Sequence, residues 1–253
     1  MNRKYILNAI ATLLVVSFPL LVVADDSVNA VLTKYETILS TSRIIYTQQS
    51  EGEILSVKNP QEYPVLIQSV VLDENKSESE DYVVTPPVFR LDANKTNKLD
   101  VISSSDDKPN DREKLNWLCV KSIPPKNDDA WMNDSDEKNK LKNTRVNLQL
   151  SLNNCIKIIY RPDSLKESPA KAAGKVAWKA NGETLRAVND SPYYINIASI
   201  DVDGNAPVKI DYVPPFGTRD FLFKKSISGA KSVRWNFIND YGGKSDTLIN
   251  SID

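Results

Sequence analysis

The sequence predicts an all-β protein with two immunoglobulin-like β-sandwich domains in tandem. Three features of the 253-residue chain support this fold class. Short runs rich in β-branched and aromatic residues recur with turn residues between them, one segment alternates apolar and polar residues strictly, and no long helical period interrupts the series. Many short strands separated by turn signals are typical of a sandwich, and the length allows two domains of about a hundred residues each.

The first domain is expected to consist of short strands separated by proline-containing breaks. Asn59-Pro60 and Thr85-Pro86-Pro87 mark strand ends or sheet edges, because proline has no N–H to donate to a ladder. The expected strands cover residues 42–46, 53–58, 65–72, 82–84, 99–102, 115–123 and 146–160.

The last of these strands carries the clearest pattern in the chain. Four apolar residues alternate with Asn147, Gln149 and Ser151 and therefore share one face of a strand. The apolar residues are Val146, Leu148, Leu150 and Leu152. The same alternation places Lys157 on the opposite face. The pattern alone favours an ordinary half-buried core strand, although such a strand rarely needs this lysine.

A long polar segment precedes this strand, and a second β-rich series follows it. Residues 124–145 are too charged to pack and predict a mobile loop. Residues 163–174 are polar or small and predict an interdomain linker. The second series of expected strands covers residues 175–179, 184–187, 193–200, 208–212, 219–223 and 232–238.

The N-terminus has the pattern of a secretory signal. Arg3 and Lys4 precede an apolar run from Ile10 to Val23, and Ala24 provides a small residue at the cleavage point. Cleavage after Ala24 predicts an exported, soluble mature chain, and no later stretch approaches the roughly 20 apolar residues of a spanning helix. The expected organisation is a signal peptide at 1–24, a first domain at 25–163 and a second domain at 164–253.

Composition argues against catalysis and nucleic-acid binding. The chain contains no histidine, which removes the commonest general base and the commonest zinc ligand. It also lacks the nucleophile-elbow, phosphate-loop and dinucleotide-binding glycine motifs. Its 32 basic and 33 acidic residues are spread along the chain without a basic stripe. We therefore expect no enzyme, no catalytic residue, no cofactor, no metal site and no nucleic-acid partner.

Cys119 and Cys155 are the only two cysteines. In an exported chain, a single pair makes one disulfide the default expectation. Two buried free thiols remain the alternative. The spacing excludes a CxxC redox site.

Several segments, in order along the chain, carry a resemblance to a known family. They are SRIIY at 42–46, NPQEYPVLIQS at 59–69, TPPVFRLD at 85–92, DREKLNWLCVKSIPPK at 111–126, NNCIKIIYRP at 153–162 and NDYGG at 239–243. The ordered set resembles the periplasmic chaperones of the chaperone/usher pathway, which assemble pili and capsule-like fibres. The long loop before the last strand and the two cysteines resemble the long-loop subfamily, which serves thin or capsular fibres such as the F1 capsular antigen.

The resemblance implies a boomerang of two domains with a cleft between them. Arg43 and Lys157 match the two basic cleft residues that anchor the C-terminal carboxylate of a fibre subunit. The structural alternative is a pair of surface cations in ordinary ion pairs. Glu113, Arg161 and Asp240 match an ion network at the domain junction.

The resemblance also implies a donor strand, made of Val146, Leu148, Leu150 and Leu152, which is lent to an incomplete subunit. Residues 28–32 are expected to add a strand beside it. The expected partners are a fimbrial or capsular subunit and an outer-membrane usher. An unoccupied donor strand is expected to be capped by self-association or by the polar loop. The alternative from another class is a secreted fibre subunit or adhesin with self-contained sandwiches, in which residues 146–152 are ordinary core.

Overall fold

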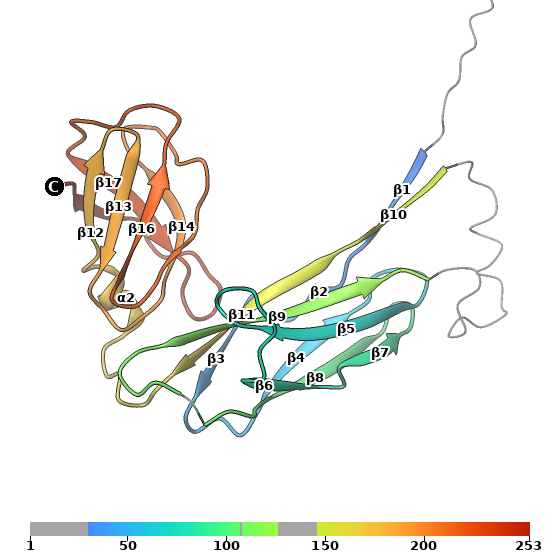
Figure 1. The fold of residues 1–253 in the computed structure, drawn as a ribbon. Helices are drawn as coiled ribbons and strands as arrows, with labels where there is room; N and C mark the ends of the chain where they lie inside the picture. Colours follow the sequence, from blue (N-terminus) through green and yellow to red (C-terminus); the bar gives the residue numbers. More distant parts are fainter. Residues whose placement is uncertain (1–29, 107, 126–145) are drawn as a thin grey trace, which may run out of the picture.

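The computed structural model describes residues 30–106, 108–125 and 146–253, and for residues 30–35 and 146–150 it describes the backbone only. The predicted signal peptide, its cleavage point after Ala24 and most of the predicted 124–145 loop lie outside the described residues. Figure 1 shows two β-rich bodies set at an angle to each other. No helix among the described residues is long and apolar enough to cross a membrane.

The first body is a sandwich of two sheets. One sheet has the order β2-β4-β8-β6 and the other the order β3-β11-β9-β5-β7. The strands of the first sheet are β2 (Ile38–Leu39), β4 (Glu53–Lys58), β8 (Thr96–Ser103) and β6 (Tyr82–Thr85). The strands of the second are β3 (Arg43–Thr47), β11 (Asn153–Arg161), β9 (Lys114–Ile123), β5 (Val65–Leu72) and β7 (Val88–Leu91).

Alternation along β11 separates the core from the domain junction. Ile156, Ile158 and Tyr160 belong to the core of the first sandwich. Lys157 and Ile159 lie on the opposite face of the strand, because successive side chains point to opposite sides of a sheet. The residues on this outward face that meet the second body are Ile45 in β3, Ile159 in β11, and Leu115 and Trp117 in β9, packed with Tyr194 and Tyr212.

One strand predicted in the first domain needs correction, and two short strands were missed. The expected single strand 146–160 is broken at Leu152, since β10 (Val146–Ser151) ends there and pairs differently from β11. The short strands β2 and β7 were not predicted. The chain changes sheet between Thr85 and Val88, in agreement with the break expected at the two prolines.

Strand β10 forms a separate two-stranded sheet with β1 (Ala30–Tyr35). The pairing is parallel, with Ala30 opposite Val146 and Tyr35 opposite Ser151. Figure 1 shows these two strands running side by side away from the sandwich. The strand expected at residues 28–32 therefore lies beside β10 as predicted, with described bounds of 30–35.

The second body is a sandwich whose core is built around Trp178, Trp235 and Phe221. Its sheets have the orders β12-β13-β16 and β15-β14-β17-β18. The strands are β12 (Ala177–Asn181), β13 (Thr184–Asn189), β16 (Gly217–Leu222), β15 (Tyr212–Val213), β14 (Ile195–Asp201), β17 (Ser232–Phe237) and β18 (Leu248–Ser251). The tandem-sandwich prediction is confirmed.

Two expectations for the second body were wrong in detail, and one strand was missed. The stretch predicted as a linker contains the short helix α2 (Pro169–Ala173), capped by Ser168, and its Ala172 and Ala173 are buried in the second core. The small side chains allow close packing against the core. Composition alone could not show whether such a stretch is a packed helix or a linker. The strand expected at 208–212 is reduced to Tyr212–Val213, and β18 was not predicted.

Candidate functional site

Arg43 and Lys157 lie next to each other between the two sandwiches. Strands β3 and β11 pair in parallel with Arg43 opposite Lys157, and β11 pairs with β9 so that Lys157 also lies opposite Trp117. The three residues form one row across three strands. They line a hollow of about 310 Å³, whose other wall includes Asn196 and Tyr212 from the second sandwich.

Arg43 is almost fully buried, with an exposed fraction of 7%. Its Nη1 donates a hydrogen bond to the Ile238 carbonyl at 3.3 Å, whereas its Nε is buried and has no hydrogen-bond partner. Burial lowers the pKa of Arg43, and the nearby Asp240 and Glu113 carboxylates only partly oppose this effect. Arg43 lines the hollow, and its guanidinium therefore has a donor that no residue in the described part of the chain satisfies.

Lys157 presents its ammonium group to the same hollow. Its Nζ donates to Asn196 Oδ1 and lies 4.7 Å from the centroid of the Tyr212 ring and 5.4 Å from that of Trp117. Burial and then the charge of Arg43 lower the pKa of Lys157 to about 8. Neither Lys157 nor Arg43 forms an ion pair with another residue in the described part of the chain.

Two adjacent cations that form no ion pair among the described residues suit an anionic ligand, although the carboxylate of Asp211 also lines the hollow. A carboxylate has two oxygens and accepts charge-assisted hydrogen bonds from both an ammonium and a guanidinium. The described residues contain no cluster of three or more His, Cys, Asp or Glu side chains that could hold a metal ion. The geometry of the hollow thus favours recognition of a carboxylate by direct hydrogen bonds.

A disulfide lies beside this row. Cys119 in β9 and Cys155 in β11 are directly opposite in the antiparallel register and are joined by an S–S bond of 2.02 Å. The prediction of one disulfide is confirmed. The bond fastens β11 to β9 two residues before Lys157, and Cys155 itself lines the hollow.

The residues predicted to form an ion network are in contact. Arg161 Nε lies 2.7 Å from Glu113 Oε1, and its Nη1 and Nη2 lie 2.7 and 2.9 Å from the two oxygens of Asp240. Glu113 Oε2 also accepts a hydrogen bond from the Tyr194 N–H at 2.7 Å. Burial opposes the charge of Arg161, but the Asp240 and Glu113 carboxylates outweigh it and hold its pKa above the ordinary value. The network joins the two sandwiches.

The predicted donor strand is attached to the first sandwich at its C-terminal end. Ser151 Oγ donates to the Ser122 carbonyl at 2.6 Å, and the Ser122 N–H donates to the Leu152 carbonyl at 3.1 Å. Strand β10 pairs only with β1 among the described residues, so its other edge has no neighbouring strand. Leu152 is half-buried. The side chains of Val146, Leu148 and Leu150 lie outside the described residues, and the direction of these side chains stays a prediction.

Comparison with known proteins decides the family. The model of the pili and flagellar-assembly chaperone PapD N-terminal domain matches residues 36–166, and that of the pili assembly chaperone PapD C-terminal domain matches residues 171–248. The chain belongs to this family of pilus-assembly chaperones. It is similar to chaperone protein Caf1M of Yersinia pestis, with 43% identity over 94% of this chain and 95% of that one.

Other relatives of this chaperone agree. Chaperone protein AggD of Escherichia coli is 37% identical over 83% of this chain and 82% of its own. The E. coli chaperone DraB has a TM-score of 0.73 and 35% identity, covering 88% of this chain and 100% of that one. The SafB chaperone of Salmonella enterica, solved in complex with the SafA pilin, has a TM-score of 0.74 and 35% identity, covering 88% and 99%. These relatives favour a chaperone over a fibre subunit or adhesin.

Sequence reasoning missed the part of the site that comes from the second sandwich of the chaperone. Asn196 and Tyr212 complete the hollow around Lys157, and Trp117 extends the row of Arg43 and Lys157. No local signal marks Asn196 or Tyr212, because they reach the cleft only through the relative placement of the two sandwiches. Trp117 had a signal, since alternation along residues 115–123 places it on the same face as Leu115.

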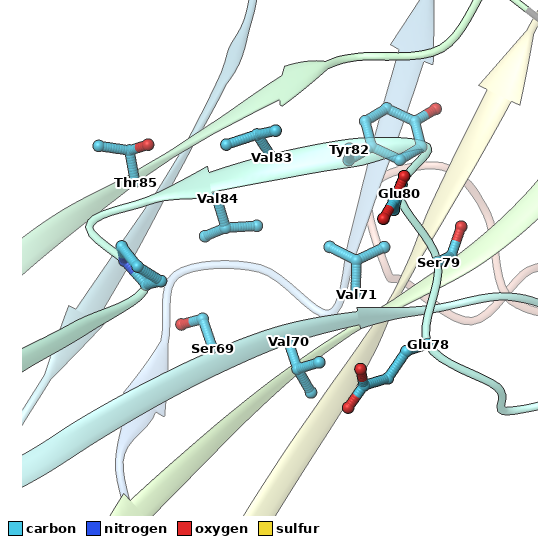
Figure 2. A pocket seen from close by; sticks show the side chains of 11 residues that line it. Ser69, Val70, Val71, Glu78, Ser79, Glu80, Tyr82, Val83, Val84 and Thr85 are labelled. Carbon is cyan, nitrogen blue, oxygen red and sulfur yellow. The ribbon is translucent and has the colours of Figure 1, made fainter.

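A second hollow, of about 400 Å³, lies between β5 and β6 of the chaperone (Figure 2). Two backbone hydrogen bonds to β5 border the hollow. The Ser69 N–H donates to the Pro87 carbonyl, and the Ser79 N–H donates to the Val71 carbonyl. The Ser69 Oγ is buried there without a hydrogen-bond partner. Figure 2 shows valines and acidic side chains around this hollow and no cation, so it differs in chemistry from the hollow at Lys157.

Proposed function

We propose that this chaperone captures pilus or capsular fibre subunits in the periplasm by lending them strand β10, and that it delivers them to an outer-membrane usher. The SafB chaperone, which is 35% identical, was solved with a pilin bound, and this supports a subunit as the partner. Family membership also supports an assembly role without catalysis.

The observation that carries this proposal is the pair of adjacent cations in the interdomain hollow. Arg43 and Lys157 are opposite each other in register and lack ion-pair partners among the described residues. A subunit that places its C-terminal carboxylate there would satisfy both cations with charge-assisted hydrogen bonds. Because β11 leads back to β10 along the chain, anchoring the carboxylate would also fix the register of the subunit strand that pairs with β10.

The donated strand supplies the apolar part of the interaction. The free edge of β10 offers its backbone to a subunit groove, which is β-strand addition. Val146, Leu148, Leu150 and Leu152 would then fill the groove, spanning about 20 Å at two residues per step. Burial of four such side chains supplies roughly 6 to 12 kcal/mol before ordering costs are subtracted.

The disulfide and the ion network have supporting roles in this proposal. The bond between Cys119 and Cys155 holds β11 beside β9 near the C-terminal end of β10, so less conformational entropy is lost when a subunit is captured. The pairs of Arg161 with Glu113 and Asp240 fix the interdomain angle. Buried ion networks are weak evidence for net stability, so the proposed role is geometric.

The proposal includes the location of the protein and its processing. Cleavage after Ala24 would release an exported chain with domains at 25–163 and 164–253. One similar solved protein is a periplasmic chaperone, SfaE, at 27% identity, which supports the periplasm as the compartment. Self-association through β10 when no subunit is bound is proposed as a means of covering its free edge.

The test is coexpression with the fibre subunits encoded beside this gene, followed by purification from periplasm. We expect a stable one-to-one complex in which the subunit is protected from proteolysis. A subunit lacking its last residues, and hence the original position of its carboxylate, is the matched control and should be captured poorly. Failure of every neighbouring subunit to copurify with the folded chaperone would contradict the proposal.

A further inference from the structure

A loop of the first sandwich holds two tyrosines of the second with one carboxylate. Glu74 lies in the connection between β5 and β6, and its Oε2 accepts a hydrogen bond from the Tyr194 hydroxyl at 2.9 Å. Its Oε1 accepts another from the Tyr212 hydroxyl at 3.0 Å. Both tyrosines are 8% exposed, and these hydrogen bonds satisfy hydroxyls that are largely removed from water.

The loop that presents Glu74 is held in shape by its own hydrogen bonds. Asp73 exchanges backbone and side-chain hydrogen bonds with Ser77, at 2.8 and 2.9 Å, and its carbonyl accepts from the Lys76 N–H at 3.1 Å. Lys76 has a φ of 68°, which is uncommon for a residue other than glycine. Its Nζ lies 2.9 Å from the centroid of the Trp117 ring. The loop is therefore preorganised and contacts the aromatic cluster at two points.

This aromatic cluster forms a wall of the hollow that contains Lys157. The Tyr212 ring packs against Tyr194 with centroids 5.5 Å apart and against Trp117 at 6.5 Å. The ammonium of Lys157 lies 4.7 Å from the Tyr212 centroid. Glu74 thus contacts Lys157 through a single intermediate, the Tyr212 ring, although it does not itself line the hollow.

Tyr194 links this contact to the ion network. Its backbone N–H donates to Glu113 and its hydroxyl donates to Glu74, so one residue of the second sandwich is bonded to the first sandwich at both ends. The sandwiches are also joined by Arg161 with Asp240, by Arg43 with the Ile238 carbonyl and by Lys157 with Asn196. The Glu74 contacts add attachment at the aromatic cluster, the length of a tyrosine side chain away from the Glu113 contact, and so restrict rotation further.

We propose that Glu74 is a positioning residue for subunit capture. It fixes the angle between the two sandwiches and holds the Tyr212 ring against Lys157, so that the lysine stays buried and directed toward the incoming carboxylate. This inference rests on the proposed function for its effect on capture. Its structural part, the restriction of the interdomain angle, is independent of any ligand.

The structural part is tested on the free chaperone with residual dipolar couplings, which report the relative orientation of the two domains. Glu74→Ala and the Tyr194→Phe/Tyr212→Phe pair should both broaden the range of orientations, whereas Glu78→Ala, an acidic exposed residue of the same loop, should not. The Tyr194→Phe/Tyr212→Phe pair removes the same two hydrogen bonds and serves as the second variant should Glu74→Ala fold poorly. An unchanged orientation in folded Glu74→Ala, or in the folded phenylalanine pair, would overturn the inference.

The functional part is tested by subunit affinity as a function of pH. Loss of the two hydrogen bonds should weaken capture by about tenfold at neutral pH. The pH at which capture weakens should rise in Glu74→Ala above the wild-type value, because Lys157 becomes more hydrated once the Tyr212 wall loosens. If Glu74→Ala has the wild-type subunit affinity and loses capture at the wild-type pH, Glu74 does not position the site. If the wild-type chaperone captures no subunit, the proposed function fails, while the dipolar couplings still decide the structural part.

Discussion

Lys157 lies directly beside Arg43 across the parallel strands β11 and β3, and neither residue is paired with a carboxylate among the described residues. Burial in the half-enclosed hollow lowers the pKa of both residues, and the charge of Arg43 lowers that of Lys157 further. Arg161, at the same domain junction, differs because it forms ion pairs with Glu113 and Asp240. This difference supports the proposal that Arg43 and Lys157 serve a ligand.

Replacing either cation should abolish capture without unfolding the chaperone. Lys157→Ala or Arg43→Ala leaves the subunit carboxylate without one of its partners in the cleft, a loss of roughly 2 to 5 kcal/mol in binding free energy. Removal of a desolvated charge that forms no ion pair among the described residues should leave the melting temperature of the free protein unchanged or higher. Copurification and a thermal melt measure the two effects.

The matched control for these variants is Lys98→Ala. Lys98 is an exposed lysine on β8, in the opposite sheet, and its removal changes the net charge by the same amount. It should capture subunit at the wild-type level. Wild-type yields of complex from Lys157→Ala or Arg43→Ala would show that the anchoring role is wrong.

Capture should weaken as the pH rises through about 8. The pKa of Lys157 is lowered to about 8 in the free protein, so its ammonium is fully charged only below that pH. Above it, affinity should fall by about tenfold per pH unit, since one proton must be taken up to form the ion pair. The stability of the free protein changes with pH in the opposite direction. The pKa of Lys157 in the folded state is below the ordinary 10.5, so its charge destabilises the fold at low pH, and the free energy of unfolding increases as the pH rises from about 8.

The matched variant for the pH dependence is Lys157→Arg. Arginine remains charged throughout this range, so its affinity should show no loss near pH 8. Binding titrations of both proteins between pH 6 and 10 decide the question. A wild-type curve that stays flat while the protein remains folded would rule out Lys157 as an anchor that titrates in this range.

Unreduced protein from periplasm should contain no free thiol. Cys119 and Cys155 are bonded across neighbouring strands and close a segment with a sequence separation of 36. On the chain-entropy model, the Cys119→Ser/Cys155→Ser pair should lose roughly 3 to 4 kcal/mol of unfolding free energy. Subunit affinity should fall as well, because β11 is no longer fastened at the root of the donor strand.

Mass spectrometry of alkylated, unreduced protein counts the thiols, and denaturant unfolding gives the loss of stability. Chemically reduced wild-type protein is the control, because it lacks the bond but retains both side chains. Two alkylated cysteines in native periplasmic material would contradict the bonded state. Equal subunit affinities of the oxidised and reduced proteins would contradict the proposal that the disulfide strengthens capture.

The sequence predicted the features that are encoded locally. The strands at 53–58 and 65–72 have the predicted bounds, because hydrophobic runs between turn residues specify a strand with little help from the rest of the chain. Arg43 and Lys157 were named as two basic residues of the cleft through their resemblance to family motifs, not through a local pattern. What alternation could not show is that these two residues are direct neighbours, which depends on the parallel register of β3 and β11.

Features that depend on long-range packing were missed. Leu152 interrupts the predicted strand because β10 leaves the sandwich to pair with β1, and no residue type at that position signals a break. Ala172 and Ala173 belong to a core rather than to a linker, because they pack in the same buried cluster as Trp178. Glu74 looks like any acidic loop residue in the sequence, and its role arises from two tyrosines more than a hundred positions away.

The donor strand separates a chaperone from a self-contained sandwich. If Leu148, Leu150 and Leu152 enter a partner, Leu150→Asp should barely change the melting temperature of the free chaperone, because β10 lies in a separate two-stranded sheet with β1. The same change should abolish capture, since it buries a carboxylate in an apolar groove. If these residues were core, the unpaired charge would unfold the domain.

The matched control is Gln149→Asp, which adds the same charge to the alternate face of the strand and should leave capture largely intact. Self-association through β10 would complicate the melt, so the measurement should be made in dilute solution with light scattering to confirm a monomer. Among the described residues, the hydrogen bonds between β10 and β9 are at the end of β10, where Ser151 bonds to Ser122, and this predicts that the leucine face contributes little to the stability of the free monomer. A collapsed melt for monomeric Leu150→Asp would refute the donor-strand proposal, whereas an unchanged melt with lost capture is the result that only a donated strand explains.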